Sequence, residues 1–262
     1  MSHAETPYDA RIGEPATQAQ LLTVVERQPY PLLFMTLSGA HLYGFPSADS
    51  DYDLRGVHIL PLREVIGLRT GRETIEQSEV CNGMHLDLVT HEVKKFSLLL
   101  LKKNGYVLEQ LYSPLVVQTT PVHAELQAIA RGCVTRYHAY HYLGLARSQW
   151  QLFETEGRVK PLLYVYRALL TGIHLMRTGE VEANLLRLND MFRLPFLAEL
   201  IAYKQEGSEQ TVLPEGQTAW HQQEYGQLRA ALEATSKTSQ LPPAPSAQAA
   251  LHALLVRLRL AQ

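Results

Sequence analysis

The chain is poor in cysteine, in long apolar runs and in excess positive charge, and each deficit excludes a class of protein. Its two cysteines, Cys81 and Cys133, lack metal-site or redox spacing, so we expect small buried side chains in a reducing compartment. The stretch "FSLLLLKK" is too short to span a bilayer, and "MSHAETPYDARIGEPATQAQ" lacks the pattern of a secretory signal. We therefore predict a cytoplasmic protein without a membrane segment.

A net charge of −2 excludes a broad basic surface, so any site for a polyanion must be local. The hydrophobic content of 46% is that of an ordinary globular protein, and 262 residues suit one large domain or two small ones. After a polar lead-in that includes a helix over 16–28, alternating or continuous apolar residues predict strands over 31–39, 51–60 and 84–91. A helix over 92–104 follows, and then a helix end and an extended segment over 108–121.

Beyond Pro121 the periodicity is helical only. The helices are expected over 122–131, 132–155, 159–178, 181–206, 217–234 and 246–261. The sequence thus predicts an α+β protein, with a mixed-sheet domain over 1–120 followed by an α-helical domain over 121–262.

Three aspartates interrupt the predicted strands. Asp51 and Asp53 alternate in "DYDLRGVHIL", so their side chains should leave the same face of the strand. Neighbouring carboxylates repel each other unless a cation lies between them, and their oxygens suit Mg²⁺. Asp87, in "MHLDLVTH", is placed to supply a third carboxylate from a neighbouring strand. An Asp-x-Asp pair alone also occurs at solvated strand edges and in turns.

The turn formed by Ser38 and Gly39 supplies a second element of the same chemistry. Gly39 allows the backbone to approach a ligand closely, and backbone N–H groups of the following "AHLYG" can bind phosphate, with the Ser38 hydroxyl as a further donor. A phosphate-binding turn followed by paired carboxylates meets the needs of nucleoside triphosphate chemistry.

The stretch "LSGAHLYGFPSADSDYDLRGV" resembles the nucleotide-binding motif of the DNA polymerase beta-like nucleotidyltransferase superfamily, which more often has Gly-Ser or Gly-Gly where this chain has Ser-Gly. Within that superfamily, "SDYDLRGV", "HLDLVTHEVKKFSLLLLKKNGYVLEQLYSP" and "KPLLYVYRALLTGIHLMRTGE" resemble the bacterial branch associated with RNA repair pathways. The resemblance covers roughly residues 32 to 180.

This resemblance implies roles for individual residues. Asp51 and Asp53 match the ligands of the nucleotide-bound metal, and Asp87 matches the carboxylate that helps to activate the attacking hydroxyl. Ser38 and Gly39 match the phosphate-binding turn. Arg55 lies within the motif on the aspartate face of the strand, where it pairs with a carboxylate or a phosphate, or else forms a surface ion pair.

Helical spacing places Lys160, Tyr164 and Arg167 on one face of the helix over 159–178, together with Thr171 and His174. The two cations are suited to phosphate and the tyrosine to stacking on a base, although an ordinary solvated helix face has the same pattern.

The stretch from Arg131 to Arg177 has seven Lys or Arg residues against two Glu, with aromatic residues between them, a pattern typical of single-stranded nucleic-acid binding and also of a helical core. His138 and His141 have metal-ligand spacing without an evident third ligand, so we expect a polar surface or partner contacts there.

The sequence as a whole predicts a Mg²⁺-dependent nucleotidyltransferase, with Mn²⁺ as an alternative metal, that transfers a nucleoside monophosphate from a triphosphate and releases pyrophosphate. The resemblance implies that the acceptor is an RNA end. Transfer to a protein or a small molecule, and a nucleotide-binding regulator without turnover, remain as alternatives, and the sequence does not indicate an oligomeric state.

Overall fold

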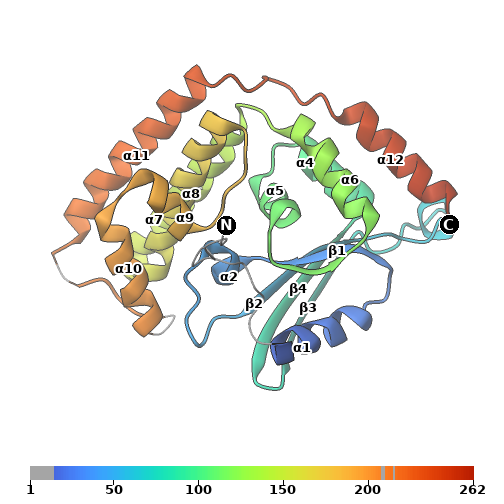
Figure 1. The fold of residues 1–262 in the computed structure, drawn as a ribbon, viewed down its shortest axis with the longest axis horizontal. Coiled ribbons are helices and arrows are strands. Elements are labelled where there is room, and N and C mark those ends of the chain that lie inside the picture. The colour runs from blue at the N-terminus through green and yellow to red at the C-terminus, as the bar shows by residue number, and fades with distance from the viewer. Residues whose placement is uncertain (1–14, 208–209, 215) are drawn as a thin grey trace, which may run out of the picture.

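The computed structural model describes residues 15–207, 210–214 and 216–262, in which a mixed sheet with its covering helices lies beside a helical bundle (Figure 1). The sheet has the strand order β3-β4-β2-β1-β5. Strands β2 and β4 are parallel, and every other neighbouring pair is antiparallel. The strands are β1 (Leu32–Leu37), β2 (Tyr52–His58), β3 (Thr74–Cys81), β4 (Met84–Glu92) and β5 (Val116–Thr119).

The helices account for the rest of the regular structure in the described part of the chain. They are α1 (Pro15–Glu26), α2 (Gly39–Tyr43), α3 (Arg63–Ile66), α4 (Val93–Leu101), α5 (Gly105–Tyr112), α6 (Pro121–Ala130), the 3-10 helix η1 (Arg131–Cys133), α7 (His138–Glu156), α8 (Val159–Thr178), α9 (Leu185–Phe192), α10 (Pro195–Glu206), α11 (Thr218–Thr238) and α12 (Gln248–Leu260). None of them is long and apolar enough to cross a membrane.

The two faces of the sheet are covered by different helices. Arg27 and Gln28, directly after α1, bond to Glu79 and Gln77 of β3. These two β3 residues share a face with their register partners Leu86 and Leu88 of β4. The opposite face receives α5, whose Gln110 carbonyl accepts a hydrogen bond from Thr36 of β1. Helices α4 and α6 lie with α5, away from α1 (Figure 1).

The predicted strands over 31–39, 51–60 and 84–91 are confirmed, and so is the extended segment that becomes β5. Strand β3 was not expected, because this edge strand carries two glutamates and buries little of either face. Its signal is the Asn82-Gly83 pair, with φ values of 49° and 83°, which forms the tight turn of a hairpin with β4.

The predicted helices are confirmed with three corrections. The expected helix over 132–155 begins only at His138, because the 3-10 helix η1 ends at Cys133 and Val134 has an extended backbone. The expected helix over 181–206 is two helices, because Pro195 cannot continue α9 and instead begins α10. The expected helix over 92–104 is shorter than predicted. Helix α4 already ends at Leu101, and the Asn104 side chain accepts a hydrogen bond from the N–H of Tyr106 at the start of α5.

Helix α8 is the centre of the helical bundle, where it packs against α7, α9, α10 and α11. The expectation that one of its faces is polar and open is wrong for two of the residues on that face. Arg167 and Thr171 are fully buried, and the Thr171 hydroxyl donates to the carbonyl of Glu182. The helix is therefore enclosed along most of its length.

The last helix returns to the sheet side of the molecule. Helix α12 packs against α4 and α6 (Figure 1). Its Arg259 donates hydrogen bonds to the buried carboxylate of Glu92 and, at 2.7 Å, to the carbonyl of Leu60. Helix α6 also packs on β1, so chain segments from beyond residue 120 help to cover the sheet. The division into domains at residue 120 stays a prediction.

Candidate active site

The turn at Ser38 and Gly39 lies directly against Asp53. Ser38 precedes helix α2, and its N–H donates to the carbonyl of Asp53 at 2.8 Å. Gly39 has a φ of 61°, which favours glycine, and a Cβ built on it would lie 1.8 Å from Asp53 Oδ2. Glycine is thus required here twice, for its conformation and for the space that the carboxylate occupies.

Asp53 and Asp87 are register partners on the parallel strands β2 and β4, so their side chains lie side by side on one face. The guanidinium of Arg55 bridges them, because its Nη2 donates to Asp53 Oδ1 and to Asp87 Oδ2, each at 2.7 Å. Its Nη1 also donates to the carbonyl of Asp87 at 2.5 Å. Ser78 of β3 donates to the other Asp87 oxygen at 3.3 Å. A cation therefore lies between the two carboxylates, as their mutual repulsion requires, and this cation belongs to the chain itself.

Asp51 differs from the expectation. Strand β2 begins at Tyr52, so Asp51 lies just before the strand and is exposed, and the strand face that it was expected to share begins only at Asp53. Within the described residues, no three His, Cys, Asp or Glu side chains gather into one cluster, but Mg²⁺ needs only one or two carboxylates together with waters and substrate phosphates. The carboxylates are close in the fold without forming a completed metal cluster.

The pKa of Asp53 reports the surroundings of this carboxylate. Burial raises the pKa above the ordinary value of 3.8, and Arg55 opposes the rise. Asp87 and Asp51 raise the pKa further, whereas Lys160 lowers it. The charges of Asp51 and of Lys160, on α8, therefore both act on the centre of the site.

A cavity of about 350 Å³ opens beside Asp53. It joins the two parts of the molecule, because Tyr164 of α8 lines it together with residues of the sheet, α2 and α5. The lining residues are Ser38, Gly39, Tyr43, Asp53, Arg55, His91, Tyr106, Val107, Gln110 and Tyr164. The structure thus brings Tyr164 to the same cavity as the turn, Asp53 and Arg55.

Arg167 is placed differently from its expected role. Its side chain is 0% exposed, and its Nη1 donates at 2.7 Å to Oε1 of Glu109, which is also buried. The guanidinium lies 3.9 Å from the centre of the Tyr43 ring, and the Tyr43 hydroxyl donates to Glu109 at 3.2 Å. Burial alone would lower the pKa of Arg167, but Glu109 and Tyr43 outweigh it and hold the pKa above its usual range. Arg167 therefore joins α8 to α2 and α5 instead of facing a ligand.

Glu109 was not singled out from the sequence. It lies in "LEQLY", where a glutamate in an amphipathic helix normally points to solvent. Its partner Arg167 follows 58 residues later, so no local pattern connects them.

His138 also differs from its expected surface position. It is fully buried, and its ring nitrogen Nδ1 lies 3.3 Å from the Thr135 hydroxyl. Burial lowers the pKa of His138 to about 4, so the ring is neutral at physiological pH. Cys133 is buried as expected, whereas Cys81 is only partly covered, and both are free thiols.

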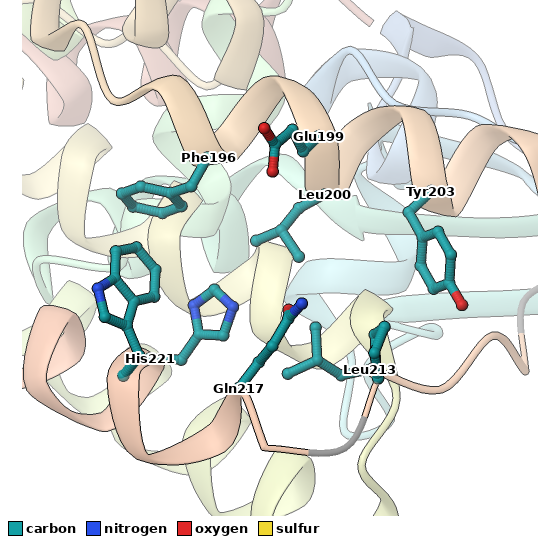
Figure 2. Close-up of a pocket in the computed structure, with 9 residues that line it drawn as sticks. Phe196, Glu199, Leu200, Tyr203, Leu213, Gln217 and His221 are labelled. Atoms are coloured by element: carbon teal, nitrogen blue, oxygen red, sulfur yellow. The ribbon is translucent and has the colours of Figure 1, made fainter.

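A second cavity, of about 380 Å³, lies between α10 and the start of α11 (Figure 2). Phe196, Leu200 and Tyr203 project into it from α10, and His221 lies below Phe196 in this view (Figure 2). The Tyr166 hydroxyl lies 2.7 Å from His221 Nδ1, and burial lowers the pKa of His221 to about 4. None of the aspartates of the sheet lines this cavity, and no sequence pattern predicted it.

Comparisons with known proteins find the following similarities. The family model RlaP, described as the RNA repair pathway DNA polymerase beta family, matches residues 14–257. The uncharacterized protein MJ0002 of Methanocaldococcus jannaschii is 34% identical over 156 residues, which cover 58% of this chain and 63% of that protein. The uncharacterized protein YcgL of Bacillus subtilis is 30% identical over 156 residues, or 57% of this chain and 58% of that protein. The aligned part of this chain thus spans about three fifths of the length of these relatives.

Among solved structures, a nucleotidyltransferase-like protein from Exiguobacterium sibiricum 255-15 is similar with a TM-score of 0.34 and 11% identity. The similarity covers 84% of this chain and 74% of that one. A similarity this low carries no argument about the site.

Proposed function

The chain belongs to the RNA repair pathway DNA polymerase beta family, and from this membership we propose that it transfers a nucleoside monophosphate from a nucleoside triphosphate to an RNA end. One observation carries the proposal. Asp53 and Asp87 lie side by side on β2 and β4, and Asp53 touches the glycine turn at the mouth of a cavity that α8 also lines. Adjacent carboxylates beside a backbone turn suit a triphosphate and its divalent cation.

The chemistry of the donor set fits such a cation. Asp53 and Asp87 present oxygen atoms toward a shared position that the Arg55 guanidinium already bridges, and Asp51 adds negative charge from the start of β2. Mg²⁺, or Mn²⁺ in its place, would supply charge neutralisation at the triphosphate and the leaving pyrophosphate. Asp51 and Asp53 would hold it, with Asp87 as the third ligand. Arg55 would then release a carboxylate and turn toward phosphate oxygens, which a guanidinium binds equally well.

The remaining residues would bind different parts of the triphosphate. The backbone N–H groups that follow Ser38 and Gly39 would donate to the phosphates, and Lys160 would oppose phosphate charge from α8. Tyr164 lines the cavity from the same helix and offers a ring for stacking on the base. Arg167 has no direct part in this proposal, because it is buried against Glu109.

In the reaction, a hydroxyl oxygen of the acceptor attacks the α-phosphorus. The bond from that phosphorus to the bridging oxygen breaks, and pyrophosphate leaves with the electron pair. Asp87, whose side chain is 41% exposed against 25% for Asp53, is the carboxylate better placed to take the hydroxyl proton. Most of the rate enhancement would come from positioning and from neutralised charge.

The test is incubation of the protein with each α-labelled triphosphate, Mg²⁺ and a panel of RNA ends. We expect label in RNA with wild type, none with Asp53→Asn, and wild-type labelling with Asp190→Asn, which changes an exposed aspartate of α9. Label found only in protein or in an added small molecule would replace RNA as the acceptor. Triphosphate binding without any transfer would contradict the proposed enzyme and favour a nucleotide-binding regulator.

A further inference from the structure

We propose that a surface formed by Lys102, Lys103, Tyr137, Tyr140 and His141, called here the tyrosine-lysine platform, binds the unpaired nucleotides of the acceptor strand. These residues line an open pocket of about 540 Å³ at the junction of α4, α5 and α7. The inference rests on the proposed function, because it names where the acceptor of that same reaction lies.

The two tyrosines form a surface suited to stacking. Their rings are nearly parallel, with an interplanar angle of 13° and centroids 5.9 Å apart. Tyr137 is 38% exposed and Tyr140 is 68% exposed, so neither ring is part of the core. Exposed aromatic faces bind unpaired bases without regard to their identity, because every base has a π-face.

The two lysines supply the charge for a phosphate backbone. Lys102 is exposed, and the ammonium group of Lys103 lies 4.9 Å from the centre of the Tyr137 ring. Lys103 has a φ of 62°, a backbone conformation that favours glycine over lysine. No carboxylate belongs to the described residues that line the pocket. Positive charge beside stacked rings matches single-stranded nucleic acid better than a protein or an apolar ligand.

The platform is adjacent to the active-site cavity. Tyr106 lines that cavity, and its ring packs perpendicular to His141 of the platform with centroids 5.0 Å apart. The start of α5 is tightly packed here, because a Cβ on Gly105 would lie 2.6 Å from His141 Cδ2. The Tyr106 ring thus lies between the platform and the cavity that Asp53 lines, and an acceptor strand on the platform would reach the cavity by passing this ring.

The cavity beside α10 (Figure 2) is an alternative site for the acceptor strand, since it too is lined by aromatic side chains. Its charged residue, however, is the carboxylate of Glu199, which repels phosphate. It also provides a matched control, because Tyr203 lines it and is 43% exposed.

The experiment measures the anisotropy of a labelled single-stranded RNA titrated with full-length protein, without triphosphate. Tyr140→Ala should lower the affinity on the order of tenfold. Lys102→Ala should reduce the slope of log affinity against log salt by about 0.7. Tyr203→Ala and Lys237→Ala, which change exposed side chains elsewhere, should bind as wild type does. A fully paired duplex should bind more weakly than the single strand, because its bases are not free to stack.

The proposed platform would be contradicted by unchanged RNA affinity in Tyr140→Ala and Lys102→Ala. It would also be contradicted if Tyr203→Ala lost as much RNA affinity as Tyr140→Ala. Equal binding of single strand and duplex would overturn stacking as its basis. Triphosphate affinity, measured on the same variants, distinguishes failure of the platform from failure of the proposed function. If wild type binds no triphosphate the proposed function fails, whereas a platform failure leaves triphosphate binding intact in every variant.

Discussion

Glu109 of α5 and Arg167 of α8 form an ion pair in which both side chains are buried, and the Tyr43 ring of α2 covers the guanidinium. The pair connects α5 to the centre of the helical bundle, and Tyr43 brings α2 into the same contact. Glu109→Gln would leave the Arg167 charge buried without its counter-ion, so we expect a loss of about 3–5 kcal/mol in the free energy of unfolding. Urea titration followed by circular dichroism measures it. Combining the change with Arg167→Met should recover part of the loss, and an undiminished loss would contradict this account.

Gly39 is required by the position of the Asp53 carboxylate as well as by its own backbone. Gly39→Ala would introduce a methyl group where Asp53 Oδ2 lies, so we expect the carboxylate to move and nucleotidyl transfer to be lost. Gly83→Ala is the matched control, since Gly83 also has a positive φ but has nothing within 4 Å of a built Cβ. Gly83→Ala should lose about 1–2 kcal/mol of stability, Gly39→Ala should lose more because of the contact with Asp53, and only Gly39→Ala should lose activity. Activity retained in Gly39→Ala would separate the turn from the chemistry.

Asp87 should affect turnover more than binding. Asp87→Asn keeps the size of the side chain but removes its ability to accept the proton of the attacking hydroxyl, so kcat should fall far more than triphosphate affinity. Single-turnover kinetics and direct triphosphate titration distinguish the two quantities. Parallel loss of binding and turnover would make Asp87 a binding or structural residue.

The acid limb of the pH-rate profile should report Asp53. Burial raises the pKa of this carboxyl, and a protonated Asp53 cannot serve the cation, so kcat/KM should fall as the pH drops through that raised pKa. Arg55 lowers the pKa, so Arg55→Gln should move the acid limb to higher pH. The effect of pH on folding stability through Asp53 is opposite to its effect on activity. A raised pKa means that the folded state binds the proton more tightly, so this carboxyl favours folding at low pH and loses that contribution as the pH rises. A limb that stays in place in Arg55→Gln would contradict the assignment.

Lys160 should contribute to triphosphate binding from α8. Lys160→Ala removes the cation that lowers the pKa of Asp53 from that helix, and we expect triphosphate affinity to weaken by about 1.5–3 kcal/mol. Its effect on RNA affinity should be small. Isothermal titration of triphosphate into this variant and into Lys237→Ala gives the comparison. Equal affinities would mean that Lys160 lies on an ordinary helix surface.

Local patterns predicted most of the fold and the neighbouring positions of Asp53 and Asp87. Alternation along β2 and β4 predicted that Asp53 and Asp87 project from neighbouring strands, because side-chain direction in a strand follows directly from position. Strand β3 was not predicted, because an edge strand has few buried apolar residues and only its Asn82-Gly83 turn indicates a hairpin.

Arg167 shows what helical spacing alone does not predict. Helical spacing placed it correctly on one line with Lys160 and Tyr164, but spacing does not reveal what packs against that line. The outcome depends on Glu109, a residue 58 positions away that only the tertiary fold brings near. A polar stripe on a central helix therefore predicts contact with polar groups and leaves open whether those groups belong to a ligand or to the protein.

The contact of Arg259 with Glu92 bears on how the protein is made. Glu92 is 2% exposed, and its carboxylate accepts hydrogen bonds from the N–H of Lys94 and from Arg259, which is translated 167 residues later. While the chain is still being synthesised, the Glu92 carboxylate must either stay hydrated or be buried with the N–H of Lys94 as its hydrogen-bond donor and without Arg259. The face of α4 that α12 will cover stays open to water during the same interval. Completion of the sheet side thus waits until α12 has left the ribosome, long after Asp53 and Asp87 have been translated.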